Sequence, residues 1–152
     1  MAKYVLDTNV YINATRDEDW NDQLVAFYSV QTPFVHLHSV VAGELLAGAV
    51  RPGLEKETHR RFLAPFEAVG RVITPSHAAW KRACEIVAAL VRRGRLSPGG
   101  VGRSFLNDCL IAASSREHGF VLVTDDVDDF ELIASEEPIR VVPPWPWGEL
   151  SI

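Results

Sequence analysis

Short apolar segments typical of β-strands alternate along this chain with longer segments that have the spacing of α-helices. Strands are expected at residues 3–7, 34–38, 71–74, 120–124 and 139–142. Helical patterns cover residues 8–15, 23–30, 40–50, 54–67, 77–93 and 104–118, with a loop and short helix at 126–135. Because strands that alternate with helices build parallel sheets, the sequence predicts a three-layer α/β/α fold with a mostly parallel central sheet.

The expected helix ends are marked by residues that cap helices. Ser39 and Ser76 are positioned to cap the helices that follow them, and Gly119 to end the helix before it. A chain of 152 residues is long enough for one domain with a sizeable core. We therefore expect residues 1–152 to form a single domain, with residues 143–152 a tail rich in Pro and Trp.

The chain has no segment that looks like a targeting signal or a membrane anchor. No apolar run approaches the roughly 20 residues of a membrane span, and Met1-Ala2-Lys3 does not resemble the start of a signal peptide. We expect a cytoplasmic protein without a membrane partner.

Charge is distributed unevenly along the chain, although the net charge is only −5. Residues 51–103 hold 11 of the 15 Lys and Arg residues but only 4 of the 20 Asp and Glu residues. Such a basic middle could bind a polyanion, or it could be a solvated helical face. Arg92, Arg93, Arg95 and Arg103 flank the loop 94–102, where we expect a clamp for RNA phosphates, the alternative being a charged helix end.

Four carboxylates lie in or directly after apolar segments: Asp7, Glu44, Asp108 and Asp126. A carboxylate beside a core is costly unless it is paired or binds a cation. Asp7 and Asp126 alone could be helix caps, but Glu44 and Asp108 interrupt apolar helical segments. Moreover, ligand sites of parallel sheets lie beyond the carboxyl ends of the strands. The four acids therefore predict one shared pocket for a hard divalent cation such as Mg²⁺ or Mn²⁺.

Four short motifs around these acids resemble, in order and spacing, the motifs of PIN-domain nucleases. They are residues 6–10 (Leu-Asp-Thr-Asn-Val), 44–48 (Glu-Leu-Leu-Ala-Gly), 107–113 (Asn-Asp-Cys-Leu-Ile-Ala-Ala) and 124–130 (Thr-Asp-Asp-Val-Asp-Asp-Phe). The chain length and motif style are similar to VapC-type toxins of toxin–antitoxin pairs. The resemblance implies an Mg²⁺- or Mn²⁺-dependent endoribonuclease that acts on tRNA or rRNA, forms a homodimer and is inhibited by a cognate antitoxin.

Carried onto this sequence, the resemblance makes Asp7, Glu44, Asp108 and Asp126 the catalytic and metal-binding acids. Thr8, Asn9, Thr124 and Asp129 are expected to support them, and Asp129 could also substitute for Asp126. The acidic run from Asp125 to Asp129 departs from the family pattern, because it would repel RNA unless it is screened. The number of metal ions stays open.

Three other functions fit parts of the pattern. The chain could be a PIN nuclease that is not a toxin, or a catalytically silent PIN module that binds RNA or protein. A phosphatase similar to haloacid dehalogenases would need a second Asp two residues after the first, and Asn9 stands there instead.

Overall fold

A five-stranded, fully parallel sheet forms the centre of the molecule in the computed structural model, which describes residues 2–145. The strands are β1 (Lys3–Leu6), β2 (Val35–His38), β3 (Val72–Ile73), β4 (Phe120–Val123) and β5 (Arg140–Val142). Their order across the sheet is β3-β2-β1-β4-β5, so β1 lies in the middle, between β2 and β4. The predicted parallel α/β architecture is confirmed.

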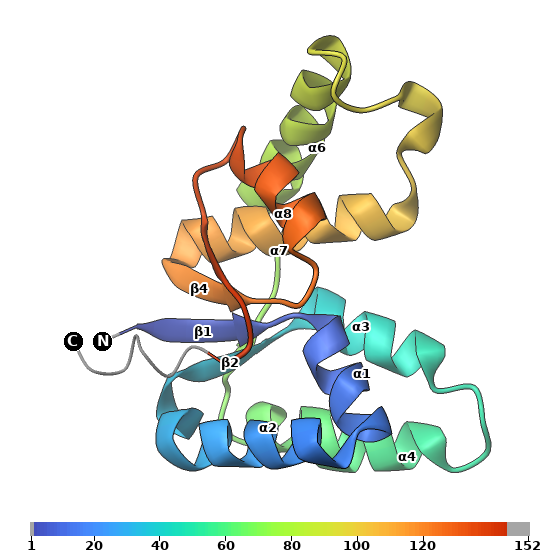
Figure 1. Cartoon of the computed structure of the whole chain (residues 1–152), viewed down its shortest axis with the longest axis vertical. Coiled ribbons are helices and arrows are strands. Elements are labelled where there is room, and N and C mark those ends of the chain that lie inside the picture. The colour runs from blue at the N-terminus through green and yellow to red at the C-terminus, as the bar shows by residue number, and fades with distance from the viewer. Residues whose placement is uncertain (1, 146–152) are drawn as a thin grey trace.

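Helices cover both faces of the sheet. They are α1 (Thr8–Arg16), α2 (Glu18–Gln31), α3 (Ser39–Gly48), α4 (Leu54–Thr58), α5 (Ala64–Glu67), α6 (His77–Arg92), α7 (Arg103–His118) and α8 (Val127–Ala134). In Figure 1, α6, α7 and α8 lie above the sheet, whereas α1, α2 and α4 lie below it. Helix α3 lies beside the carboxyl ends of the strands and contacts both α1 and α7.

The caps follow the sequence at two of the three predicted positions. The hydroxyl of Ser76 accepts a hydrogen bond from the N–H of Ala79 at 3.1 Å, and Gly119 ends α7 with a left-handed backbone, φ 71°. The prediction for Ser39 is wrong, since Ser39 is the first residue of α3. The cap is His38, whose Nδ1 accepts from the N–H of Val40 at 3.1 Å and so takes the place of the expected hydroxyl.

The helix predicted at 54–67 is continuous but contains one wide turn. Residues 59–63 form a π-helical turn between α4 and α5, and Pro65 follows in the first turn of α5. Proline has no N–H for the preceding turn, and its ring clashes with a regular α-helix. π-Helical structure is rare in proteins and occurs mostly as single turns of this kind inside α-helices.

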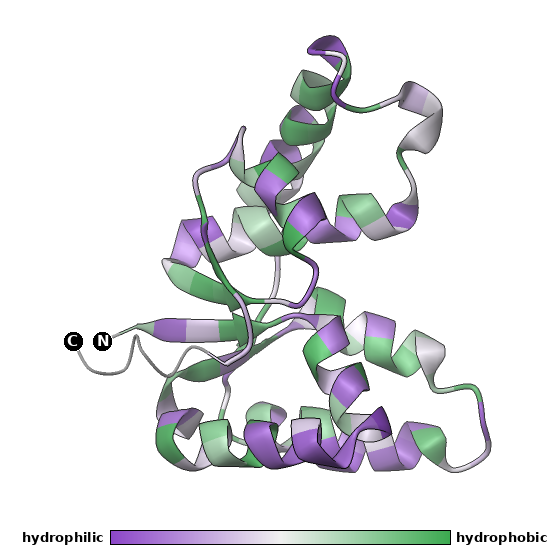
Figure 2. Ribbon diagram, viewed as in Figure 1, coloured by the Kyte–Doolittle hydropathy of each residue, from purple (hydrophilic) through white to green (hydrophobic). Residues whose placement is uncertain are grey.

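The core lies between the sheet and the helices on each face. All four residues of β4 are buried, and Figure 2 shows hydrophobic residues along this strand but hydrophilic stretches on α2 and α4. Burying a side chain the size of Phe or Leu stabilises a fold by about 1.5–3 kcal/mol. The ring of Trp145, from the predicted tail, packs against Trp20 at 5.7 Å and Phe27 at 5.8 Å. The rest of that tail, residues 146–152, lies outside the described residues.

Within residues 2–145, none of the helices combines the length and the hydrophobicity that crossing a bilayer requires.

Candidate metal centre

The carboxyl ends of β1 and β4 lie side by side, and an acidic loop or helix start follows each. Leu6 and Val123 are partners at this edge, and the N–H of Asp7 donates to the carbonyl of Val123 at 2.9 Å. The hydroxyl of Thr124 then donates to Oδ2 of Asp7 at 2.7 Å. The parallel register of the two strands thus brings the first and last predicted motifs into direct contact.

Asp7 is held in place by hydrogen bonds on both of its carboxylate oxygens. Oδ1 accepts from the N–H of Thr8 at 2.8 Å, and Oδ2 accepts from Nδ2 of Asn9 at 3.1 Å as well as from Thr124. Only 5% of Asp7 is exposed. Burial raises the pKa of Asp7 to about 6, although the hydrogen bonds from Thr124 and Thr8 act in the opposite direction.

Glu44 reaches the same edge from α3. Its Oε1 accepts a hydrogen bond from the hydroxyl of Thr8 at 2.8 Å. Thr8 therefore contacts two of the four predicted acids, Asp7 through its backbone and Glu44 through its side chain. This bridge fixes α3 relative to β1.

Asp108 is the most perturbed acid of the site. It lies on α7 and is 8% exposed. Burial raises the pKa of Asp108 to about 8, and the negative charges of four other acids add to the rise: Asp7, Glu44, Asp126 and Asp129. A cation bound among these acids would offset both the burial and the repulsion that raise the pKa of Asp108. The raised pKa is therefore what a site suited to a cation would show when no cation is bound.

Three of the acids form a compact set of oxygen donors. One carboxylate oxygen from each of Asp108, Asp126 and Asp129 lies within 4.8 Å of the other two. Asp126 precedes α8 and Asp129 lies in its first turn, whereas Asp108 comes from α7. Such all-oxygen sets suit Mg²⁺, Mn²⁺ or Ca²⁺ rather than softer metals.

The sequence placed Asp126 in the metal site and Asp129 beside it as support. In the structure the carboxylates of both residues are equally part of the compact set around Asp108. Asp7 and Glu44 are not members of that set, but their charges act on Asp108. The four predicted acids therefore lie close enough to affect one another. Asp129, expected only as a supporting residue, lies in the compact set with Asp108.

The residues predicted as support form a hydrogen-bonded chain between the two strand ends. Nδ2 of Asn9 donates to the hydroxyl oxygen of Thr124 at 3.2 Å, and Oδ1 of Asn9 accepts from the N–H of Asp125 at 3.1 Å. The same hydroxyl of Thr124, which is fully buried, accepts from the N–H of Asp126 at 3.0 Å. These contacts fix the backbone that carries Asp126 relative to Asp7.

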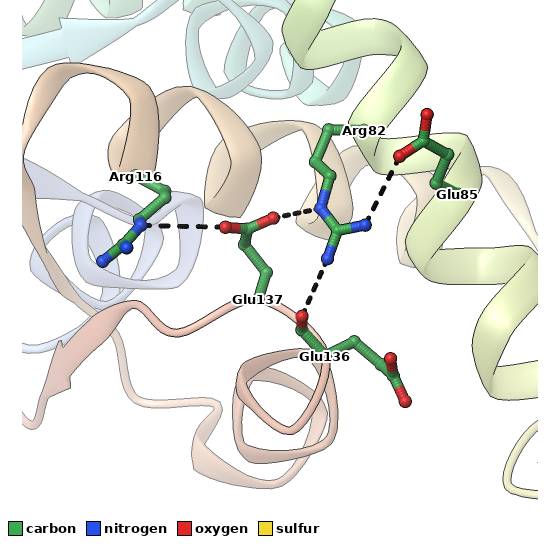
Figure 3. Close-up of polar contacts among 5 residues, drawn as sticks. All are labelled: Arg82, Glu85, Arg116, Glu136 and Glu137. Atoms are coloured by element: carbon green, nitrogen blue, oxygen red, sulfur yellow. Dashed lines mark hydrogen bonds and ion pairs between the residues drawn. The ribbon is translucent and has the colours of Figure 1, made fainter.

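The far end of α8 is anchored by ion pairs to α6 and α7 (Figure 3). Glu137 accepts a hydrogen bond from Nε of Arg82, and its carboxylate lies 3.8 Å from Nε of Arg116. Arg82 also donates to the carbonyl of Glu136 at 2.8 Å and lies 3.4 Å from Glu85 on its own helix. This network could not be predicted from the sequence, because Arg82 and Glu137 lie far apart in the chain and belong to no motif.

The four arginines predicted to bind RNA lie in different environments. Nε of Arg93 is 3.0 Å from Oε1 of Glu136, and Nη1 of Arg95 donates to the hydroxyl of Ser135 at 2.9 Å, so both contact the end of α8. Arg103 instead lines a cavity that it shares with Glu44. Arg92, at the end of α6, is exposed, and no hydrogen bond or ion pair within residues 2–145 involves its side chain. Among these four arginines, Arg103 is the one that lines a cavity together with one of the acids, Glu44.

These features define a class of protein: a three-layer α/β fold with an acidic site at the carboxyl edge of a parallel sheet. The model of the PIN-domain family matches residues 4–136. The chain belongs to the PIN-domain family. Comparison with curated protein sequences gives no significant match.

Several solved structures have the same fold, and one of them is described as a toxin–antitoxin complex. The matched chain of DNA-bound VapBC from Salmonella typhimurium is 26% identical, with a TM-score of 0.67 and coverage of 94% of this chain and 98% of the other. FitAcB from Neisseria gonorrhoeae is 21% identical, with a TM-score of 0.68 and coverage of 94% and 99%. A toxin–antitoxin complex from Klebsiella pneumoniae is 24% identical, with a TM-score of 0.62 and coverage of 94% and 98%. The last two likenesses concern the fold alone.

Proposed function

We propose that this protein is a cytoplasmic, metal-dependent endoribonuclease and the toxin of a toxin–antitoxin pair, with tRNA or rRNA as its substrate. The proposal rests chiefly on the compact set of Asp108, Asp126 and Asp129 beside Asp7 and Glu44. Membership of the PIN-domain family and the likeness to VapBC support it. A silent module would have no need to keep five acids together at such an electrostatic cost.

The acids have distinct places in the proposed chemistry. Asp108, Asp126 and Asp129 would hold Mg²⁺ or Mn²⁺, which when bound lowers the pKa of water and neutralises charge on the phosphate. Asp108 carries a proton at neutral pH in the cation-free protein, because its pKa is raised to about 8, and must release that proton when the cation binds. Asp7 and Glu44, fixed by Thr8, line the same site and would orient the attacking water and the phosphate.

An antitoxin is the protein partner that we propose. A second cavity of about 600 Å³ lies between α1, α3 and the 54–63 helical segment and reaches Glu44. Its lining combines the apolar side chains of Leu54 and Phe62 with Arg16 and Arg51. An antitoxin segment with apolar and acidic residues would fit this surface and would cover Glu44. We also propose a homodimer, which sedimentation of the purified toxin would test.

Induced expression tests the toxin proposal directly. Growth arrest with discrete new 5′-phosphate RNA ends, for wild type but not for Asp7→Asn, would support the proposal and name the RNA. No arrest and no new ends, with folded protein present, would favour a PIN nuclease with another substrate or a binding module. Cyclic phosphate ends would mean attack by the ribose 2′-hydroxyl and would refute hydrolysis by a metal-bound water.

Calorimetry tests the metal site without any RNA. Titration of Mn²⁺ into wild type in two buffers of different ionisation enthalpy should show binding with release of about one proton near pH 7. Asp108→Asn should bind more weakly and release fewer protons. Equal binding by the wild type and this variant would remove Asp108 from the metal site.

A further inference from the structure

A cavity of about 600 Å³ lies beside the acids, on the side where α3 meets α6 and α7. We call it the Trp80 cavity, and the residues that matter for its chemistry are Gly43, Glu44, Trp80, Arg103, Asn107 and Leu110. Glu44 is one of the acids of the metal centre, and Asn107 directly precedes Asp108. The cavity therefore shares Glu44 with the acids of the candidate metal centre.

Three side chains around this cavity are free of hydrogen bonds and ion pairs within residues 2–145 and could therefore contact a ligand. The indole of Trp80 is 48% exposed, whereas Phe105 and Phe120 are at most 9% exposed. Within residues 2–145, no hydrogen bond or ion pair involves the side chain of Trp80, Arg103 or Asn107. An exposed aromatic face, a carboxamide and a guanidinium are thus available together at one site.

The floor of the cavity is open because α3 presents small residues there. A Cβ atom added at Gly43 would meet no heavy atom within 4 Å, and the same holds at Gly48. Gly43 lies inside α3 and has no positive φ, so nothing in the backbone requires glycine at this position. The absence of side chains here leaves room above the helix rather than satisfying a turn.

We infer that the Trp80 cavity binds the base of an unpaired nucleotide next to the scissile phosphate, an inference that rests on the proposed function. The base would stack on Trp80, the carboxamide of Asn107 would hydrogen-bond its edge, and Arg103 would contact the neighbouring phosphate. This subsite would make the enzyme select single-stranded RNA, since a base within a helix cannot reach the indole.

RNA fits this cavity better than a protein segment does. Arg103 makes no ion pair among residues 2–145, and its charge complements a phosphate of a strand that reaches Glu44. Among residues 2–145, Glu44 is the one acidic residue in the lining, so the acidic run from Asp125 to Asp129 lies outside the cavity. The RNA path is therefore expected on the α3 side of the metal centre, away from the charges that would repel it.

Cleavage of short single-stranded RNAs would measure the contribution of the stack. Trp80→Ala should raise KM about 5- to 160-fold with little change in kcat, because one base–aromatic stack contributes about 1–3 kcal/mol. Trp80→Phe should recover most of this loss, and Gly43→Leu should fill the cavity and reproduce it. Val30→Ala, which shortens an exposed side chain on α2, is the matched control and should cleave as wild type does.

Substrates that lack a single base provide the decisive comparison. In wild type, an abasic nucleotide at one position beside the cut should cost the same factor as Trp80→Ala, and the variant should lose nothing further at that position. Equal losses in wild type and variant at every position would overturn the inference.

Two measurements separate this inference from the proposed function. In the inactive Asp108→Asn protein, the indole N–H signal of Trp80 in an NMR spectrum should shift on addition of single-stranded RNA. No shift would overturn the subsite even if wild type cleaves RNA, whereas a shift without Mn²⁺ binding or cleavage by wild type would refute the proposed function alone. If Trp80→Ala abolishes self-association and leaves RNA affinity unchanged, the cavity is an interface between two copies and the inference is wrong.

Discussion

Asp108→Asn should make the cation-free protein more stable at alkaline pH, although it inactivates the proposed site. The pKa of Asp108 rises from 3.8 to about 8 on folding, first through burial and then through repulsion by the neighbouring acids. The folded state therefore binds this proton more tightly than the unfolded state does. Stability is consequently lost as the pH rises from about 4 through the folded pKa, at up to 1.36 kcal/mol per pH unit.

The size of the effect follows from that slope. Between about pH 4 and pH 7 the loss approaches about 4 kcal/mol, and it ends near pH 8, where the folded group titrates. Asn has the same shape as Asp and no titrating proton, so the variant should escape this loss. For a chain of this size, 1 kcal/mol corresponds to about 2–4 °C in Tm. The variant should therefore unfold about 8–16 °C above wild type at pH 7 and close to it at pH 4.

Thermal unfolding in EDTA from pH 4 to pH 9 measures this difference. Asp22→Asn, a change of an exposed acid on α2, is the control and should leave the pH dependence of wild type unchanged. Addition of Mn²⁺ at pH 8 should raise the Tm of wild type more than that of Asp108→Asn. Parallel stability curves for wild type and Asp108→Asn across the whole range would refute the electrostatic reasoning.

Three further predictions concern other residues around the site. Glu137→Gln should lower the free energy of unfolding by about 1–3 kcal/mol and weaken Mn²⁺ binding, because it frees the end of α8. Denaturation measures the first effect and calorimetry the second. The control Glu85→Gln changes only an exposed contact on α6 and should alter neither the free energy of unfolding nor Mn²⁺ binding. Thr124→Val removes a hydrogen bond that lowers the pKa of Asp7, so the pKa of Asp7 should rise above about 6 in an NMR titration, and an unchanged value would exclude this contact as a cause. Arg103→Glu should weaken RNA binding and lower the slope of log K against log salt by about 1 or more, and an unchanged slope would exclude a phosphate contact at Arg103.

Much of the fold could be predicted from the sequence because its signals are local. The buried strand β4 is a run of four apolar residues, and α7 ends at a glycine that alone adopts the required backbone cheaply. Alternation of strands and helices was sufficient to predict the parallel sheet. The cap at His38 was missed because Ser, Thr, Asp and Asn are the preferred N-caps and Ser39 stands next to it, whereas the buried His38 accepts the bond through Nδ1.

The sequence by itself determined which acids to expect at the proposed site, because carboxylates beside apolar segments are costly and four of them recur in motif order. Only the tertiary structure decided their geometry. It placed Asp129 with Asp108 and Asp126, it engaged Arg93 and Arg95 at the end of α8, and it left Trp80 exposed beside Glu44. The physical reason is that a motif shows only which of its own residues are costly to bury. The distances between motifs depend on strand register and helix packing, which bring together segments that are far apart in the sequence.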